Sequence, residues 1–256
     1  MILKEFDELP SFLKEIRKPP LRVYLTKEPS LNRYVALVGA RSADFDSLEF
    51  TKKLTRCALS YGYGIVSGGA LGVDMVAHEE CLSLGGETIV VLGCGYNKAP
   101  PRLLELEKRG AILLSEFEPD KNPSRWKYRF RNRLISALSK KVVVVEAGEK
   151  SGALITARYA LEQKRELWAY GGSGSERYAG CIELIKNGYA KEVKEPSDVF
   201  VACRSDDWLL RVKHWPATFD ELLEVSNMQI SELALRLIEL EIKGRIKFFS
   251  GRFNLV

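Results

Sequence analysis

Basic and aromatic side chains alternate along residues 125–133, where the sequence is Arg125-Trp-Lys-Tyr-Arg-Phe-Arg-Asn-Arg133. Positive charge can follow a phosphate backbone, and aromatic rings can stack on bases of any sequence. Because bases stack on side chains more readily from a single strand than from a duplex, the pattern favours single-stranded nucleic acid as the ligand. The alternative is a solvated loop, and we expect at least one of Trp126 and Phe130 to pack into the core.

The positive charge of the chain is concentrated around this stretch. The 256 residues contain 39 Lys and Arg and 34 Asp and Glu, which gives a net charge of +5. Residues 121–141 hold eight of the basic residues and no acidic one, whereas residues 205–256 hold seven basic and eight acidic residues. A local basic segment of this kind indicates an anionic partner, with nucleic acid as the first candidate.

Glycines follow most of the apolar runs that read as strands. They occur at Gly39, at Ser67-Gly-Gly69, and at Gly93, Gly148 and Gly171. Each of them alone is ordinary turn chemistry. Together, at the carboxyl ends of parallel strands, they predict an edge where the backbone approaches a ligand, and N–H groups at helix starts favour phosphate. Neither a P-loop nor the G-x-G-x-x-G pattern of a dinucleotide fold is present.

Arg41 lies in the first of these turns, where a dinucleotide-binding fold needs glycine. We interpret it as a bidentate phosphate contact, with a surface salt bridge as the alternative. Groups suited to catalysis are scarce: we interpret Asp74 as a first-turn carboxylate of a helix, Cys94 as a small residue in a tight turn, and His78 as a packed or capping histidine. With only two histidines, His78 and His214, we expect no zinc site.

Six continuously apolar runs predict buried strands, near residues 34–38, 63–66, 88–92, 111–114, 142–146 and 166–170. Helical patterns separate these runs, near residues 45–61, 73–84, 102–109, 134–138, 154–164 and 179–187. Strands that are apolar on both faces and alternate with helices are typical of a parallel sheet that is covered on both sides. The predicted fold class is therefore α/β, with a doubly wound and mostly parallel sheet.

We divide the chain into three parts. Residues 1–30 form a short lead-in broken by prolines, residues 31–204 form the α/β domain, and residues 205–256 form a small second domain. Helices near 219–225 and 230–242, followed by a hairpin, give this last part the outline of a winged-helix module. No apolar run approaches the ~20 residues of a membrane span, and no signal peptide is evident. Together with the five scattered cysteines, this predicts a cytoplasmic protein with no membrane contact.

Seven segments form an ordered series: Ala36-Leu-Val-Gly-Ala-Arg41, Ile65-Val-Ser-Gly-Gly-Ala-Leu-Gly-Val-Asp-Met-Val-Ala-His78, Gly86-Glu-Thr-Ile-Val-Val-Leu-Gly-Cys-Gly95, Leu113-Leu-Ser-Glu-Phe117, Phe130-Arg-Asn-Arg-Leu-Ile-Ser-Ala-Leu-Ser139, Val145-Glu-Ala-Gly-Glu-Lys-Ser-Gly-Ala-Leu-Ile-Thr-Ala-Arg158 and Gly180-Cys-Ile-Glu-Leu-Ile-Lys-Asn-Gly188. Over about 150 residues the series resembles the motifs of the DprA/Smf family, the DNA-processing proteins of bacterial transformation. Residues 237–246 resemble the winged-helix-like C-terminal domain of that family.

The resemblance implies an extended Rossmann-like domain that binds single-stranded DNA without a catalytic residue or a cofactor. It also implies a homodimer formed through this domain, which protects incoming DNA and loads the recombinase RecA during natural transformation. By its motifs, Arg41 and either Arg125 or Lys127 hold phosphates, and Tyr128 contacts a base. The other implied DNA-binding positions are Gly39, Ser67, Gly68, Gly69, Arg131, Asn132 and Arg133. Double-stranded DNA is expected to bind more weakly.

The chain departs from the family pattern in three places. The first loop reads Ser42-Ala-Asp-Phe-Asp-Ser47 in place of the usual Pro and Tyr-Gly, and Asp44 and Asp46 are expected to lower the affinity for DNA. The usual N-terminal helical domain is reduced to about 30 residues. The nearly neutral C-terminal part is expected to contact a partner protein or a second copy rather than phosphates.

Two other functions stay open at this point. The glycine loops also resemble those of nucleotide-monophosphate phosphoribohydrolases of the lysine-decarboxylase-like type. Those enzymes carry Pro-Gly-Gly and a matching catalytic Glu, both of which residues 148–158 lack. The third hypothesis is an adaptor that joins a recombinase to other proteins without binding DNA.

Overall fold

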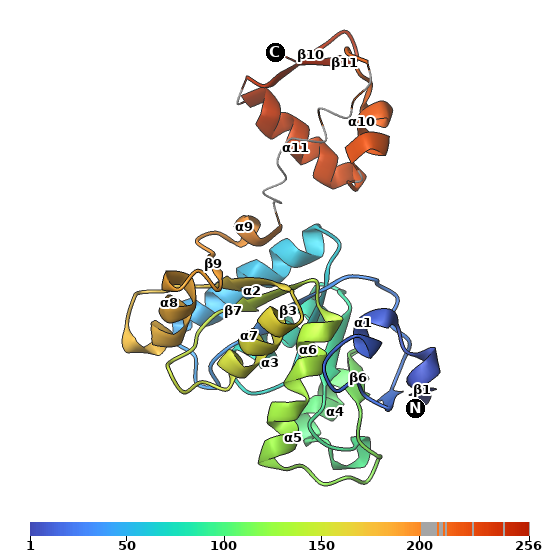
Figure 1. The fold of residues 1–256 in the computed structure, drawn as a ribbon, viewed down its shortest axis with the longest axis vertical. Coiled ribbons are helices and arrows are strands. Elements are labelled where there is room, and N and C mark those ends of the chain that lie inside the picture. The colour runs from blue at the N-terminus through green and yellow to red at the C-terminus, as the bar shows by residue number, and fades with distance from the viewer. Residues whose placement is uncertain (201–208, 210–211, 213, 227, 243, 256) are drawn as a thin grey trace. The chain divides into compact units, whose positions relative to one another are not determined.

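The computed structural model describes residues 1–256 except 201–208, 210–211, 213, 227, 243 and 256. The chain divides into two compact units, Met1–Phe200 and Val201–Val256, and each is described by itself (Figure 1). The predicted domain boundary after residue 204 falls on residues outside the described part, so that boundary stays a prediction.

The first unit is built on a nine-stranded sheet with the order β1-β2-β6-β5-β4-β3-β7-β8-β9. The strands are β1 (Ile2–Glu5), β2 (Arg22–Leu25), β3 (Tyr34–Val38), β4 (Gly64–Ser67), β5 (Thr88–Val91), β6 (Ile112–Ser115), β7 (Lys141–Val144), β8 (Glu166–Ala169) and β9 (Lys191–Glu192). All neighbours from β6 to β9 are parallel, whereas β1–β2 and β2–β6 are antiparallel. The predicted α/β fold class with a mostly parallel sheet is confirmed.

Helices cover both faces of this sheet. One face packs against α1 (Ser11–Lys14), α6 (Asn132–Leu138), α7 (Ala153–Glu162) and α8 (Ala179–Lys186), and Figure 1 shows α6 and α7 side by side. The other face packs against α2 (Phe45–Ser60), α3 (Val73–Ser83), α4 (Pro101–Lys108) and α9 (Pro196–Phe200). The remaining short elements are α5 (Arg125–Phe130) and the 3₁₀ turns η1 (Phe6–Glu8), η2 (Tyr96–Lys98) and η3 (Glu176–Tyr178).

The central strand β3 shows why the apolar runs are continuous. Val35 and Leu37 belong to the core between the sheet and α2 and α3, whereas Ala36 and Val38 belong to the core under α6 and α7. Successive residues of a strand point to opposite faces, so a strand covered on both sides needs an apolar side chain at every position. The same rule explains β4, β5 and β6, whose residues are all buried.

Several elements were not predicted from the sequence. The lead-in of residues 1–30 supplies β1 and β2, which extend the sheet beyond β6. Its end is fixed by Glu87, whose carboxylate accepts hydrogen bonds from the backbone N–H groups of Ser30 and Leu31 and from the hydroxyl of Tyr34. The two-residue strand β9 and the short helices α5 and α9 were not predicted either.

The second unit contains α10 (Phe219–Ser226), α11 (Ile230–Ile242) and the hairpin of β10 (Ile246–Phe249) and β11 (Arg252–Leu255). Leu222, Leu233, Leu237, Leu240 and Ile246 form the centre of its own core. The order of these elements is the predicted one, and the winged-helix assignment stays a prediction. Among the described helices of both units, none combines the length and the apolar character that a membrane span requires.

His78 is a buried, neutral histidine of α3. The hydroxyl of Thr88 donates to the carbonyl of Ile65 at 3.1 Å, so it accepts the hydrogen bond from Nδ1 of His78 at 2.7 Å. Within the described residues, the buried Nε2 has no hydrogen-bond partner. Burial lowers the pKa of His78 to about 3. This environment agrees with the packed histidine expected from the sequence and excludes a role as a base toward an exposed ligand.

The first prediction follows from this histidine. An unfolded chain protonates His78 below pH ~6.5, whereas the folded chain does not until about pH 3, so stability is lost as the pH falls through this range. We expect the free energy of unfolding to fall by roughly 1 kcal/mol per pH unit between pH 6 and pH 5 in urea denaturation. His78→Gln should flatten this slope, whereas the exposed His214→Gln control should keep it. Equal slopes in the two variants would contradict the assignment.

Candidate nucleic-acid interface

The carboxyl ends of β3 to β8 lie at one edge of the sheet, and the loops that follow them form what we call the rim. In an open parallel sheet this edge is the usual ligand-binding side, above all where the strand order reverses. The order reverses here between β3 and β7, because β4 to β6 extend the sheet on one side of β3 and β7 to β9 on the other. The rim contains the predicted glycines and Arg41.

Arg131 holds neighbouring loops of the rim together. Its Nη1 donates to the carbonyl oxygens of Gly68, at 2.9 Å, and of Val91, and its Nε donates to Oδ1 of Asn132 at 2.9 Å. Arg131 is 5% exposed, and burial lowers its pKa to about 10, so it stays charged at neutral pH. A Cβ on Gly68 would lie 2.1 Å from Nη2 of Arg131. Gly68 is therefore glycine because the arginine occupies the space of a side chain.

Asp74 completes the support of the same loop. Its Oδ2 accepts hydrogen bonds from the backbone N–H groups of Gly68, at 3.1 Å, and Ala70, at 3.4 Å. Burial raises the pKa of Asp74, and the positive charge of Arg131 opposes this shift. The carboxylate lies in the first turn of α3 as expected, and its contacts fix the loop rather than face a ligand.

Helix α5 lies over the loop that follows β5. A Cβ on Gly93 would lie 2.5 Å from the ring of Tyr128, so the tyrosine packs directly on the backbone there. The guanidinium of Arg131 lies 5.9 Å from the centre of the same ring. Tyr128 is half-buried, and it is placed beside the loops of β4 and β5 by the same contacts that hold Arg131.

Lys127 and Arg133 point into the protein. The ammonium of Lys127 donates to the carbonyl of Asn122 and lies 5.5 Å from the centre of the Phe117 ring. Arg133 makes a bidentate pair with Glu116, with both N···O distances 2.6 Å, and its Nε donates to the carbonyl of Lys18 at 2.8 Å. These two cations anchor the lead-in and the loop after β6.

The loop after β3 presents Arg41 to solvent. The backbone N–H of Val73 donates to the carbonyl of Ala40 at 3.3 Å, and a Cβ on Gly72 would lie 2.2 Å from that carbonyl oxygen. Gly39 is also closely packed, because a Cβ there would lie 2.5 Å from Val73. The loops after β3 and β4 therefore form one surface, with the side chain of Arg41 exposed on it.

The remaining predicted positions support this surface from inside. The hydroxyl of buried Ser67 donates to the carbonyl of Leu37 at 2.6 Å, which ties β4 to β3. Gly69 is buried and has a φ of +66°, a conformation that favours glycine. Asn132 is half-buried, and its Nδ2 donates to the carbonyl of Gly152 at 3.5 Å, so it links α6 to the start of α7.

Four exposed cations form what we call the basic face of the rim, namely Arg41, Lys121, Arg125 and Arg129. Within the described residues, these four cations form no ion pair. Trp126 is 58% exposed and packs edge-on against Phe117, while Phe130 is half-buried, so the expectation that one of these two rings packs into the core is wrong. The predicted DNA-binding positions did not include Lys121, Arg129 or Trp126, although the last two belong to the basic and aromatic stretch. For Arg129 the available signal was its spacing, because a residue four positions after Arg125 lies on the same side of a helix.

The other end of the rim is acidic. A hollow of about 460 Å³ beside α8 is lined by Glu149, Glu176 and Glu183, with Lys186 as its basic residue. Three carboxylates repel a polyanion. The part of the rim that suits a phosphate backbone is therefore the part formed by the loops after β3 to β6.

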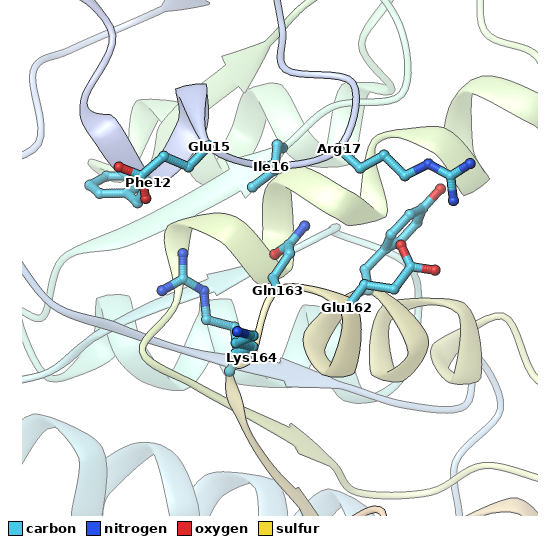
Figure 2. Close-up of a pocket in the computed structure, with 9 residues that line it drawn as sticks. Phe12, Glu15, Ile16, Arg17, Glu162, Gln163 and Lys164 are labelled. Atoms are coloured by element: carbon cyan, nitrogen blue, oxygen red, sulfur yellow. The ribbon is translucent and has the colours of Figure 1, made fainter.

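A second cavity of about 380 Å³ lies away from the rim, at the amino end of β8 (Figure 2). Figure 2 shows Arg17 and Glu15 on one side of it and Glu162 and Lys164 on the other. Charges of both signs face this space, so it is not suited to a polyanion. It lies at the opposite edge of the sheet and is not part of the candidate interface.

The rim offers poor groups for catalysis. Cys94 is buried, its Sγ donates to the carbonyl of Lys98 at 3.4 Å, and burial raises its pKa, so the thiol is protonated and unreactive. In the part of the chain that the structure describes, no group of His, Cys, Asp or Glu side chains could hold a metal ion.

A second prediction tests the packing of Arg131. Gly68→Ala places a methyl group against Nη2 of Arg131 and should lower the free energy of unfolding by about 1–3 kcal/mol in urea denaturation. Gly152→Ala is the matched control, because its φ is −63° and no atom lies within 4 Å of the new Cβ, so its effect should stay within about 0.5 kcal/mol. If Gly68→Ala is as mild as the control, Arg131 does not fill this space.

Comparison with known proteins assigns the chain to a family. A family model described as DNA recombination-mediator protein A matches residues 1–204. DNA processing protein DprA of Bacillus subtilis (strain 168) is 38% identical over 201 residues, which cover 75% of this chain and 67% of the relative.

Two solved structures share this fold. DprA of Streptococcus pneumoniae superposes with a TM-score of 0.72 and 32% identity, over 78% of this chain and 74% of that one. The structure of DprA from Helicobacter pylori, described as giving its single-stranded DNA binding mode, superposes with a TM-score of 0.70 and 28% identity, over 83% and 97%. With a Rossmann-like fold of this kind and a family match over most of its length, the chain belongs to the DNA recombination-mediator protein A, or DprA/Smf, family.

Proposed function

We propose that this chain binds single-stranded DNA across the basic face of the rim, as a DprA-type mediator of recombination. The observation that supports this most strongly is the arrangement of Arg41, Arg125 and Arg129, which are exposed cations without an ion pair in the described structure. They flank loops whose backbone is held in place by Arg131. Unpaired cations beside a fixed backbone attract a polyanion. The Helicobacter pylori relative described as binding single-stranded DNA supports the same ligand.

In this proposal Arg41 and Arg125 hold phosphates, and Arg129 adds a third basic contact. The half-buried ring of Tyr128 contacts a base, and the exposed ring of Trp126 offers a second surface for stacking. The backbone of Gly39, Gly68 and Gly69 lines the approach of the strand.

We assign supporting roles to the predicted residues whose polar atoms bond inside the protein. Lys127, Arg131 and Arg133 each donate to backbone carbonyls, and Arg133 is also paired with Glu116. All three side chains are buried, with at most 7% exposed, so a phosphate can reach little of them unless the surrounding loops rearrange. Ser67 and Asn132 similarly join neighbouring elements. These residues shape the site, and their substitution is expected to reduce stability before it changes affinity.

A nucleotide hydrolase is the less favoured function. Asp74 is buried in the loop after β4, and Glu146, which follows β7, is buried and paired with Arg177. Neither carboxylate faces a nucleotide from a position suited to acid–base chemistry. In the proposed function the protein therefore binds DNA and no residue acts as a catalyst.

We further propose that the chain acts in the cytoplasm as a homodimer formed through its Rossmann-like domain, protects incoming single strands, and loads RecA on them during natural transformation. Membership of the family supports this finer proposal. Double-stranded DNA is proposed to bind more weakly, because stacking on exposed rings needs unpaired bases.

The third prediction tests the DNA surface by fluorescence anisotropy of labelled oligo-dT across a salt series. The logarithm of affinity should fall linearly with the logarithm of salt, by about 0.7 per phosphate neutralised. Arg41→Ala should weaken binding and reduce this slope by about 0.7, whereas Trp126→Leu should weaken binding about tenfold with the slope unchanged. Arg109→Met removes an exposed arginine near the start of β6, at the opposite edge, and should bind as the wild type does.

Two outcomes of that series would contradict the proposed surface. If the wild type does not bind oligo-dT, the DNA-binding function is wrong for this chain. If Arg41→Ala and Arg109→Met behave alike, the strand lies elsewhere on the protein. Release of the base from AMP would then be the assay for the hydrolase alternative.

The fourth prediction concerns the dimer and RecA. Sedimentation velocity should give twice the mass of one chain. RecA should hydrolyse ATP faster on single-stranded DNA covered by a single-stranded DNA-binding protein when this chain is added, because a loader helps RecA reach the strand. Arg41→Ala should lose most of this stimulation. Full stimulation by Arg41→Ala would support the adaptor hypothesis, and a monomer that still stimulates RecA would refute the dimer.

A further inference from the structure

The side chain of Arg177 connects two loops of the rim that are far apart in the sequence. Arg177 lies in η3, after β8, and its Nη2 donates to the carbonyl of Ser42 in the loop after β3. Its Nε also donates to Oε1 of Glu146 at 3.0 Å, and its Nη2 lies 2.9 Å from the same oxygen. One guanidinium therefore links the residue next to Arg41 to the end of β7.

Glu146 extends this connection to the backbone of the first loop. Its Oε2 accepts a hydrogen bond from the N–H of Asp44 at 2.9 Å. Glu146 is 1% exposed, so its charge must be balanced within the protein, and Arg177 is the cation that pairs with it in the described structure. Because Ser42 and Asp44 are both held, the segment that follows Arg41 is fixed at two points.

The far end of the segment is fixed by Tyr178. This completely buried residue donates from its hydroxyl to the carboxylate of Asp44, at 2.8 Å, and lies 2.8 Å from the hydroxyl of Ser47. Asp44 also caps α2 by accepting from the N–H of Ser47 at 2.8 Å. The carboxylate expected to repel DNA is thus engaged by donors inside the protein.

Residues 39–47 contain no proline, so contacts such as these must determine the shape of the loop. The backbone before Arg41 packs against Gly72 and Val73. The backbone after Arg41 is bonded to Arg177 and Glu146. An exposed arginine pays less conformational entropy on binding a phosphate when its backbone is already held in place.

We propose that Arg177 and Glu146 are positioning residues that hold the loop of Arg41 in its DNA-binding conformation, and that Arg177 is not itself a phosphate ligand. The inference rests on the proposed function, because it assumes that Arg41 contacts the DNA. Arg177 is half-exposed, with 46% of its side chain accessible, so a direct contact with DNA is the competing assignment. The charge of Glu146 favours the positioning role, since it neutralises the guanidinium of Arg177.

The fifth prediction separates the two assignments in the same oligo-dT salt series. Arg177→Met should lower the affinity about 2- to 30-fold at every salt concentration, the range for substitutions that act through a network, with an unchanged salt slope. A phosphate ligand would instead reduce the slope by about 0.7. Arg109→Met is the matched control, because it removes the same charge from an exposed site at the opposite edge.

The Glu146→Gln substitution should change the affinity for DNA in opposite directions under the two assignments. It removes a negative charge from the rim and releases Arg177, so a phosphate-binding Arg177 should bind DNA more tightly in this variant. A positioning pair should bind DNA more weakly, because the amide holds the guanidinium and the N–H of Asp44 less strongly. Arg177→Lys should also weaken binding, since one ammonium cannot reproduce the fork that reaches both Ser42 and Glu146.

Amide hydrogen exchange, measured by mass spectrometry, tests the conformation of the loop without any DNA. In the full-length Arg177→Met protein, the peptide covering residues 40–48 should exchange faster than in the wild type, while peptides from β5 and α4 should not change. Faster exchange with weaker binding at a constant slope supports the proposal. An unchanged peptide, an unchanged affinity or a reduced slope overturns it. Failure of the wild type to bind oligo-dT refutes the proposed function instead, which the same series reports separately.

Discussion

The guanidinium of Arg131 is the contact on which the candidate interface depends. It lies among the loops that follow β4, β5 and β6, and it donates to the carbonyls of Gly68 and Val91. A buried cation is stable only when its donors are satisfied and a negative charge is near, and Asp74 supplies that charge. The loop at Gly68 is thus built around an arginine. Glycines that indicate a ligand-binding edge in the sequence serve first to admit a side chain of the protein itself.

One basic segment has two separate roles because it is helical. Within α5 and the first turn of α6, Lys127, Arg131 and Arg133 turn inward and bond to carbonyls or to Glu116. Arg125 and Arg129 turn outward and form no ion pair among the described residues. The inward cations give the segment its shape, and the outward ones leave a net positive surface. A count of basic residues along the chain does not separate the inward from the outward cations, although only the outward ones are accessible to a polyanion.

Much of the fold could be predicted from the sequence, because strands such as β3 and β7 are buried on both faces and are therefore apolar at nearly every position. The edge that carries the candidate site could also be predicted, because topology places the carboxyl ends of parallel strands together; that DNA binds there stays a prediction. The edge strand β1 was missed because its residues alternate between half-buried and exposed, so it lacks a buried-strand pattern. Strand β2 is mostly buried, but its apolar run, Val23-Tyr-Leu25, is only three residues long. The orientation of Arg131 and Arg133 could not be predicted, because their partners Gly68 and Glu116 are 63 and 17 residues away.

In the proposed function, the acidic hollow beside α8 limits the length of the contact with DNA. If carboxylates exclude the strand from the loops beyond β7, the usable rim runs from β3 to β6. That is three strand spacings of about 4.8 Å, or about 14 Å. A stacked strand rises about 3.4 Å along its axis for each nucleotide, so this length accommodates about four nucleotides. A footprint of four nucleotides holds a long strand at one point and leaves the nucleotides on either side accessible to other proteins.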